Sequence, residues 1–231
     1  MNNIYVSVLD HNFNGMPIFL ARLTQRGSEI ANLDDLLKLY NECVNMTPSD
    51  ELMALPHTTL KRMNYLTVAI FGLSTKAVSQ IRTHAKRLTF ISTSTQYSTY
   101  CNYNKYVYTS DSCVDIFKQA YASAQKYYDT LIANGVNKDD ASYLLPQGLS
   151  KILIVSGNLD DWEYVMNKRL CNRNSREVQY VMAKIYNAVK NTCGETYVKG
   201  MLPDCKLNKC REKKFSCKRD FNMEDINDSI S

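Results

Sequence analysis

Residues 65–87 read YLTVAIFGLSTKAVSQIRTHAKR, and this stretch carries most of the information about the fold. Its first part, 65–71, is a strand candidate, and Gly72 is expected to end that strand. Ser74 has the side chain of a helix N-cap. A helix is therefore predicted from Ser74 to about Arg87.

Further strands and helices are predicted on both sides of this stretch. Residues 4–9 (IYVSVL) alternate and are β-branched, which predicts a strand, and 152–155 (ILIV) form a short buried-strand candidate. Asn32 precedes leucines at helical spacing, so it is expected to cap a helix. Apolar residues recur at three- and four-residue steps over 114–131, and Asn134-Gly135 should stop that helix.

Two capping boxes are predicted further along the chain. Asp160 with Glu163 should open one helix, and Asn174 with Glu177 should open another. The pattern mixes helices and strands without the regular alternation of a doubly wound sheet, which predicts an α+β fold. We expect a single domain over residues 1–200 and a cysteine-containing basic tail with an acidic end over residues 201–231.

The composition is that of a soluble globular protein. The 231 residues are 45% apolar and 22% charged, with a net charge of +5, which favours small anions without indicating nucleic acid. No apolar run is long enough to span a bilayer, and the N-terminus does not resemble a signal peptide. A cytoplasmic protein with reduced cysteines is expected.

The sequence lacks the motifs of several common enzyme and binding-site classes. The chain has no P-loop, GxGxxG, HExxH or GxSxG, and its eight cysteines include no CxxC pair. No metal site is therefore predicted. Zinc binding by the tail cysteines remains open as an alternative to a mobile tail that ends in a disordered acidic stretch, 224–231.

Residues 74–97, STKAVSQIRTHAKRLTFISTSTQY, bring cations next to hydroxyl groups. Four donors, from Arg82 to Arg87, are followed by a run of serines and threonines that ends at Gln96 and Tyr97. Such a set suits a phosphate together with a heterocycle. A solvated basic helix face followed by a polar loop is the competing interpretation.

Residues 140–169, DASYLLPQGLSKILIVSGNLDDWEYVMNKR, form a second segment of interest. Asn158 lies where a strand gives way to a helix, so its amide is placed to bond a planar ligand. Arg169 lies near the end of that helix. A favourable contact with the helix dipole would also explain Arg169.

These two segments, in this order, resemble the flavin-dependent thymidylate synthases. The family signature RHRxxSxNExSxRY is similar to Arg82-Thr83-His84 followed by Ser94 to Tyr97, and His57-Thr58-Thr59 is similar to the family's His-x-Thr. Leu145-Pro146, Asn158 and Arg169 match its second block. The resemblance extends from about His57 to beyond Glu177.

This chain departs from the family pattern at several charged positions. Thr83 and His84 replace the His and second Arg of RHR, and two extra residues lie between His84 and Ser94. Gln96, Ser142 and Asp160 stand where the family has arginine. Lys86 and Arg87 are the natural substitutes for the missing cations.

The resemblance implies an FAD-dependent reductive methylation of dUMP at C5. Methylenetetrahydrofolate and NADPH would be the co-substrates, without a cysteine nucleophile. It also implies a homotetramer with active sites between subunits, and neither a membrane nor nucleic acid as a partner. Arg82 would bind the phosphate, and Arg169 would stabilise negative charge on the uracil as the catalytic residue.

The resemblance implies two sets of contact residues. The substrate set is Ser79, Gln80, Arg82, Ser92, Ser94, Gln96, Tyr97, Ser142 and Arg169. The cofactor set is His57, Thr59, Arg82, Thr83, His84, Asn158, Asp160 and Tyr164. The two histidines also fit ordinary packing or surface roles.

Two other functions remain open. The missing arginines fit a relative that modifies another pyrimidine nucleotide. They also fit a non-catalytic relative that binds nucleotides or nucleic acid.

Overall fold

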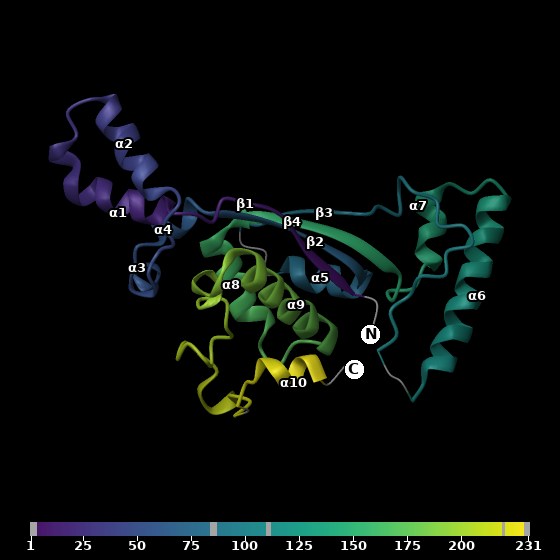
Figure 1. Ribbon diagram of the computed structural model, residues 1–231. Coiled ribbons are helices and arrows are strands. Elements are labelled where there is room, and N and C mark those ends of the chain that lie inside the picture. The colour runs from purple at the N-terminus through teal and green to yellow at the C-terminus, as the bar shows by residue number, and fades with distance from the viewer. Residues whose placement is uncertain (1–3, 84–86, 110–111, 219, 229–231) are drawn as a thin grey trace.

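The computed structural model of the protein describes residues 4–83, 87–109, 112–218 and 220–228 (Figure 1). In this part of the chain a four-stranded antiparallel sheet has the order β1-β2-β4-β3. Its strands are β1 (Tyr5–His11), β2 (Tyr65–Ser74), β4 (Ser150–Asn158) and β3 (Thr89–Ser92). The fold is therefore α+β, as predicted.

Three helices cover one face of the sheet: α5 (Thr75–Thr83), α8 (Leu159–Arg169) and α9 (Arg176–Cys193) (Figure 1). The inward residues of β2 and β4, such as Leu66 and Leu153, are fully buried against them. Trp162 of α8 is buried and donates its indole N–H to the Leu66 carbonyl at 3.0 Å. Burial of this apolar face is the main stabilising contribution to the fold.

The opposite face of the sheet carries large apolar side chains that no helix covers. Tyr5, Phe71 and Ile152 lie on neighbouring paired positions across three strands, and Ile91 lies on β3. Their exposed fractions range from 39% to 69%. An apolar patch of this kind marks an interaction surface.

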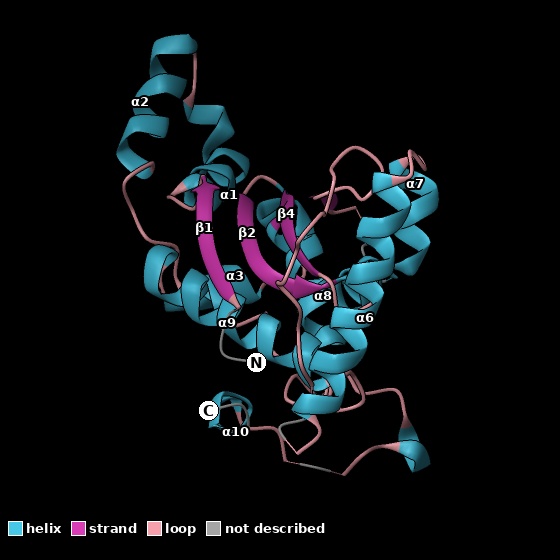
Figure 2. Ribbon diagram, turned by 90° about the vertical axis from the view of Figure 1, so that its right-hand side faces the viewer, coloured by secondary structure: helices cyan, strands magenta, loops and turns pink. Residues whose placement is uncertain are grey.

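Helices also stand at the two ends of the sheet (Figures 1 and 2). One end holds α1 (Met16–Arg26), α2 (Leu33–Cys43), α3 (Asp50–Ala54) and α4 (Thr58–Arg62). The other end holds α6 (Val114–Ala133) and α7 (Lys138–Ala141). A second small core forms at that end around Tyr100, Tyr128, Ala141 and Leu149.

Several predicted elements are confirmed. The strand over 4–9 is β1, and Asn32 caps α2 by accepting the Asp35 N–H at 2.9 Å. The long helix is α6, and Gly135 follows it at φ 81°, a left-handed conformation that favours glycine. Ser74 caps α5, because its Oγ accepts the Ala77 N–H at 3.0 Å.

Other boundaries were predicted wrongly. Gly72 does not end β2. It lies at a β-bulge, with φ 87°, where the pairing register shifts, and the strand continues to Ser74. The next helix is described as far as Thr83, Arg87 is not part of it, and residues 84–86 lie outside the described part of the chain. The competing interpretation made the hydroxyl-rich run a polar loop, but its first four residues form β3 because they pair with β4.

Neither capping box forms. The cap of α8 is Asn158, which accepts the Asp161 N–H at 2.9 Å, and Glu163 instead binds Lys61. The N-cap of α9 is Ser175, and Asn174 bonds to Arg169. In both boxes a distant partner takes the glutamate: Lys61 binds Glu163, and Ser74 binds Glu177.

The tail is more ordered than predicted. Residues Met223–Asp228 form α10, which packs against α9. Phe221 and Ile226 are buried in the main core. The prediction of a disordered stretch is therefore wrong for residues 224–228, and 229–231 lie outside the described part of the chain.

Glu177 is a buried carboxylate that joins α9 to the start of α5. It accepts hydrogen bonds from the Ser74 N–H at 2.7 Å and the Ser74 hydroxyl at 2.6 Å. Burial raises the pKa of Glu177 above its ordinary value of 4.5, against the lowering effect of these hydrogen bonds. A raised pKa means that the folded chain binds this proton more tightly than the unfolded chain does.

The variant Glu177→Gln tests this assignment through the pH dependence of stability. The wild-type contribution is complete below about pH 4.5 and is lost as the pH rises through the folded-state pKa. The loss is about 1.4 kcal/mol for each pH unit between the unfolded-state and folded-state pKa values. The variant should therefore gain unfolding free energy relative to wild type as the pH is raised from 4.5. Urea unfolding measured over this range checks it. A relative gain by wild type would mean that the Ser74 hydrogen bonds outweigh burial.

Candidate functional site

A cavity of about 490 Å³ lies between α5 and β3. Its floor and walls come from one face of α5, from β3 with the residues that follow it, and from the start of β4. Among the described residues that line it, two are cations, six carry hydroxyl groups and none is acidic. The full lining is Thr75, Val78, Ser79, Arg82, Phe90, Ile91, Ser92, Thr93, Ser94, Thr95 and Lys151.

Arg82 projects from α5 into this cavity. Thr75, Val78, Ser79 and Arg82 follow helical spacing, so they share the α5 face that borders it. The Arg82 Nη2 donates to the Ser92 hydroxyl at 3.1 Å, which links the helix to β3. The guanidinium is otherwise exposed and keeps donors free for a ligand.

The segment after β3 forms the rim of the cavity. Ser94 Oγ accepts the backbone N–H groups of Gln96 at 3.1 Å and Tyr97 at 3.3 Å, which fixes a turn. Gln96 and Tyr97 do not line the cavity, and Tyr97 is 78% exposed. Of the predicted substrate residues, the structure therefore brings together Ser79, Arg82, Ser92 and Ser94.

Two other predicted substrate residues lie elsewhere in the chain. Gln80 points away from the cavity, and its Oε1 accepts from the Ser175 hydroxyl at 2.7 Å. The Ser142 hydroxyl bonds to the Asp139 carbonyl at 2.7 Å within the α7 turn. Neither side chain contributes to the cavity in one chain.

Sequence reasoning missed Thr75, Thr93, Thr95 and Lys151. Lys151 is the most informative, because only 6% of it is exposed and it belongs to the strand that was predicted to start at Ile152. It has the same parity as the inward residues Leu153 and Val155. That alternation was a usable signal for a buried lysine.

Arg169 is buried at the end of α8, with 6% of its surface exposed. One nitrogen, Nη1, donates to the Asn174 side chain at 3.0 Å, while the buried Nε and Nη2 have no partner. Burial lowers the pKa of this guanidinium from its ordinary value. Buried donors without acceptors are costly, which makes Arg169 a candidate for binding a ligand.

Arg82 and Arg169 do not line a common cavity within one chain. No α8 residue lines the α5–β3 cavity. Arg169 instead contacts the loop before α9, whose Ser175 bonds to Gln80 on a different face of α5. The predicted convergence of these two arginines therefore stays a prediction, because the described lining of the α5–β3 cavity includes Arg82 but not Arg169.

The predicted cofactor residues gather mainly where α4 meets α8. His57 and Thr59 are exposed at the start of α4, and Tyr164 is 38% exposed on α8. Ion pairs join the two helices: Lys61 Nζ to Glu163 at 2.8 Å and Arg62 Nε to Asp160 at 3.2 Å.

The remaining predicted cofactor residues do not share one location. Both polar ends of the Asn158 side chain bond to Asp161, at 2.9 and 2.6 Å, so the amide caps the helix in this structure. Thr83 is exposed at the end of α5, with its hydroxyl bonded to the Ser79 carbonyl at 2.9 Å. His84 and Lys86 lie outside the described residues. Arg87 lies 3.5 Å from the Asp161 carboxylate.

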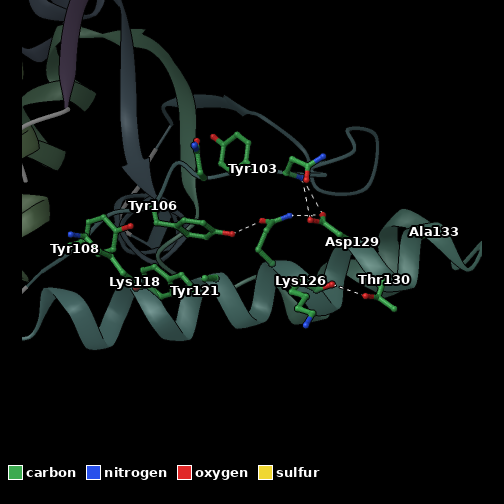
Figure 3. A pocket seen from close by; sticks show the side chains of 13 residues that line it. Tyr103, Tyr106, Tyr108, Lys118, Tyr121, Lys126, Asp129, Thr130 and Ala133 are labelled. Carbon is green, nitrogen blue, oxygen red and sulfur yellow. Dashed lines mark hydrogen bonds between the residues drawn. The ribbon is translucent and has the colours of Figure 1, made fainter.

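A second cavity, of about 640 Å³, lies along α6 and is lined by tyrosines (Figure 3). Tyr106 donates to Gln125 at 2.6 Å, and Gln125 donates to Asp129 at 2.7 Å. The rings of Tyr106 and Tyr121 stack on each other at 4.8 Å. Several polar groups of this cavity are hydrogen-bonded to one another, and one of them is a carboxylate. The cavity therefore suits an anion less well than the α5–β3 cavity.

The described residues offer neither a metal cluster nor a membrane-spanning helix. No group of three or more histidine, cysteine or acidic side chains among them is arranged to hold a metal ion. No helix of this part of the chain is long and apolar enough to cross a bilayer.

Comparison with protein families gives one clear match. The model of the thymidylate synthase complementing protein family matches residues 13–194. Among curated proteins, the flavin-dependent thymidylate synthase of Geobacter sulfurreducens is 25% identical over 174 residues, which are 73% of this chain and 74% of the relative.

Two archaeal relatives match shorter segments. The flavin-dependent thymidylate synthase of Sulfolobus acidocaldarius is 25% identical over 50% of this chain and 43% of its own length. That of Saccharolobus solfataricus is 32% identical over 33% of this chain and 29% of its own length. The chain thus spans less than half of the length of these two relatives.

Solved structures share the fold. A UMP/dUMP methylase from Streptomyces cacaoi, bound with 5-Br dUMP, superposes with a TM-score of 0.66 at 16% identity and covers 87% of this chain and 95% of its own. Thymidylate synthase X from Helicobacter pylori, with FAD and dUMP, has a TM-score of 0.63 at 15% identity, with 87% and 98% covered. At these identities the likeness shows the fold alone.

Proposed function

The chain belongs to the family of thymidylate synthase complementing proteins, and from that membership we propose that it methylates dUMP at C5 in a flavin-dependent reaction. Methylenetetrahydrofolate provides the one-carbon group and NADPH the reducing equivalents. The product is dTMP.

One observation carries this proposal: the α5–β3 cavity holds two cations and six hydroxyl groups without a carboxylate among its described lining. This is the donor set for a phosphate dianion. Arg82 binds the phosphate through the donors that Ser92 leaves free. The lining also contains no cysteine, which fits a reaction without a cysteine nucleophile.

Arg169 acts on the pyrimidine. Its buried Nε and Nη2 lack acceptors, and the carbonyl oxygens of uracil are acceptors of the right kind. A fixed guanidinium there stabilises the negative charge that develops when C5 becomes nucleophilic. The environment is also dry enough to strengthen that interaction, because only 6% of Arg169 is exposed.

The two arginines act together across a subunit interface. Arg82 of one chain and Arg169 of another converge on the nucleotide, which is supported by the lack of α8 residues in the described lining of the α5–β3 cavity. The uncovered apolar face of the sheet supports self-association, for which we propose a homotetramer.

The residues that hold FAD lie around this arrangement. His57 and Thr59 are exposed at the start of α4, Tyr164 lies on α8, and Arg82 with Thr83 contributes from α5. When bound, reduced flavin supplies the hydride that completes the methyl group. The role of these residues is to orient the ring and exclude water from it.

The reaction is tested with the purified protein, FAD, NADPH and methylenetetrahydrofolate. We expect flavin absorbance in the blue, release of tritium from C5 of labelled dUMP, and a product whose mass has increased by one methyl group. A protein that binds no flavin and releases no tritium contradicts the proposal. Nucleotide binding without turnover favours the non-catalytic alternative.

A second candidate substrate is UMP. The structural neighbour from Streptomyces cacaoi is named for both UMP and dUMP, and Gln96 and Ser142 depart from the family's arginines. The same mass measurement with UMP, dUMP and dCMP in parallel separates the substrates. A methylated product from UMP or dCMP in preference to dUMP replaces the first candidate.

A further inference from the structure

Lys151 is a buried lysine at the edge of the α5–β3 cavity. It is the second residue of β4, and only 6% of its surface is exposed although it lines the cavity. Its Nζ donates to the Thr93 carbonyl at 3.1 Å and to the Tyr100 hydroxyl at 3.3 Å. The ammonium also lies 4.8 Å from the centre of the Tyr100 ring.

No carboxylate among the described residues neutralises this ammonium. Its partners are a carbonyl, a hydroxyl and a ring face, and the described cavity lining contains no acid. A buried charge without a counter-ion is costly, and charged lysines are rarely buried unless paired. Two of its three N–H donors are used, which leaves one for a further acceptor. An anion bound in the cavity would neutralise the charge of the Lys151 ammonium.

Lys151 is also held in place more firmly than a surface lysine. The carbonyl of Thr93 and the hydroxyl of Tyr100 fix the ammonium from two sides. Tyr100 belongs to the small core around Tyr128, so its hydroxyl is itself anchored. An ammonium fixed before the ligand arrives loses little side-chain entropy on binding.

The polar groups around Lys151 complete a phosphate cradle. Ser92, Thr93 and Thr95 also line the cavity, and Arg82 borders it from α5. Gln96 and Ser142, which stand where related sequences carry arginine, do not line the cavity. A second cation for a dianion must therefore come from elsewhere.

We propose that Lys151 is a substrate-binding residue that, with Arg82, holds the phosphate of the nucleotide. The identity of the nucleotide rests on the proposed function. The role of Lys151 itself is to recognise a phosphate monoester. Lys151 sets specificity for nucleoside monophosphates over nucleosides.

The test measures binding of dUMP, UMP and deoxyuridine to wild type, Lys151→Met and Lys151→Arg. Methionine keeps the length of the apolar stem and removes the charge, whereas arginine keeps the charge. Lys118→Met is the matched control, because Lys118 lies on α6, outside this cavity, and is exposed. Thermal unfolding of each ligand-free variant accompanies the titrations, to confirm that it is folded.

Lys151→Met should bind dUMP about 10- to 100-fold more weakly, because a hydrogen bond to a charged group is lost. Deoxyuridine binding should be unchanged, Lys151→Arg should retain most of the affinity, and Lys118→Met should match wild type. The shift in melting temperature on adding dUMP should shrink only in Lys151→Met.

Four outcomes are distinguished. Equal dUMP binding by wild type and a folded Lys151→Met overturns the assignment of Lys151 and leaves the reaction standing. Equal losses of dUMP and deoxyuridine also overturn it, because the role would then be structural. If the protein binds UMP in a Lys151-dependent manner but does not bind dUMP, the phosphate-binding role of Lys151 is supported and dUMP is overturned as the substrate. Binding of no nucleotide by wild type overturns both.

Discussion

Replacement of Arg82 with alanine is expected to lower kcat/KM for dUMP about 100-fold or more. Arg82 carries the only guanidinium among the described residues lining the α5–β3 cavity, and it is anchored to Ser92 at 3.1 Å. Loss of one charged hydrogen bond corresponds to about 1.5–3 kcal/mol, and a phosphate engages the planar fork twice. Arg82→Lys should recover part of the loss, because it keeps the charge without the fork.

Steady-state kinetics and nucleotide titrations measure this effect. The matched control is Arg26→Ala, which removes an exposed arginine that pairs with Glu29 on the surface at 2.7 Å. That pair contributes little to stability, so the control should retain wild-type activity. If both variants are equally active, the α5–β3 cavity is not the phosphate site.

Replacement of Arg169 with methionine should have two separate effects: a loss of about 100- to 1000-fold in kcat and no comparable loss of stability. The first follows from removing a fixed donor that stabilises charge in the transition state. The second follows from the two buried nitrogens, Nε and Nη2, that have no hydrogen-bond partner among the described residues. Methionine of similar length relieves their desolvation and leaves only the Asn174 oxygen without its donor.

Unfolding free energies and kcat for the same preparation check both effects. The free energy of unfolding should fall by no more than about 1 kcal/mol, whereas breaking an ordinary buried ion pair costs about 3–5 kcal/mol. Arg173→Met serves as the control, because Arg173 is half exposed and pairs with Glu212 at 2.8 Å. A strongly destabilised Arg169→Met with normal kcat would show that Arg169 is a structural residue.

The sequence predicted best those elements whose causes are local. Asn32, Ser74 and Gly135 act within a few residues of their own helix ends, and each does what its residue type favours. The capping boxes failed because distant partners competed for the side chains. Ser74 lies 103 residues from Glu177, and Lys61 lies 102 residues from Glu163.

Two further errors have tertiary causes. No strand was predicted over residues 89–92, which the competing interpretation placed in a polar loop, but β4 offers them a free edge for pairing. The tail was assigned as disordered because of its charge, but Phe221 and Ile226 bury themselves against α9. The partners, β4 and α9, are too far away in the sequence to be inferred from a local pattern.

The part of the candidate site that comes from one face of α5 could be predicted from the sequence. Ser79 and Arg82 follow helical spacing, so their convergence needs only α5. Lys151 comes from a strand more than 60 residues away, which only the sheet brings into place. The role of Arg169 could not be predicted from local contacts, because its buried Nε and Nη2 meet no acceptor among the described residues.

A crystal structure of the protein with dUMP and FAD tests the central claim most directly. The phosphate should lie in the α5–β3 cavity within hydrogen-bonding distance of Arg82, with the pyrimidine facing Arg169 of a neighbouring subunit. A nucleotide seated in the tyrosine-lined cavity along α6, or a pyrimidine that no arginine from α8 reaches, would contradict it.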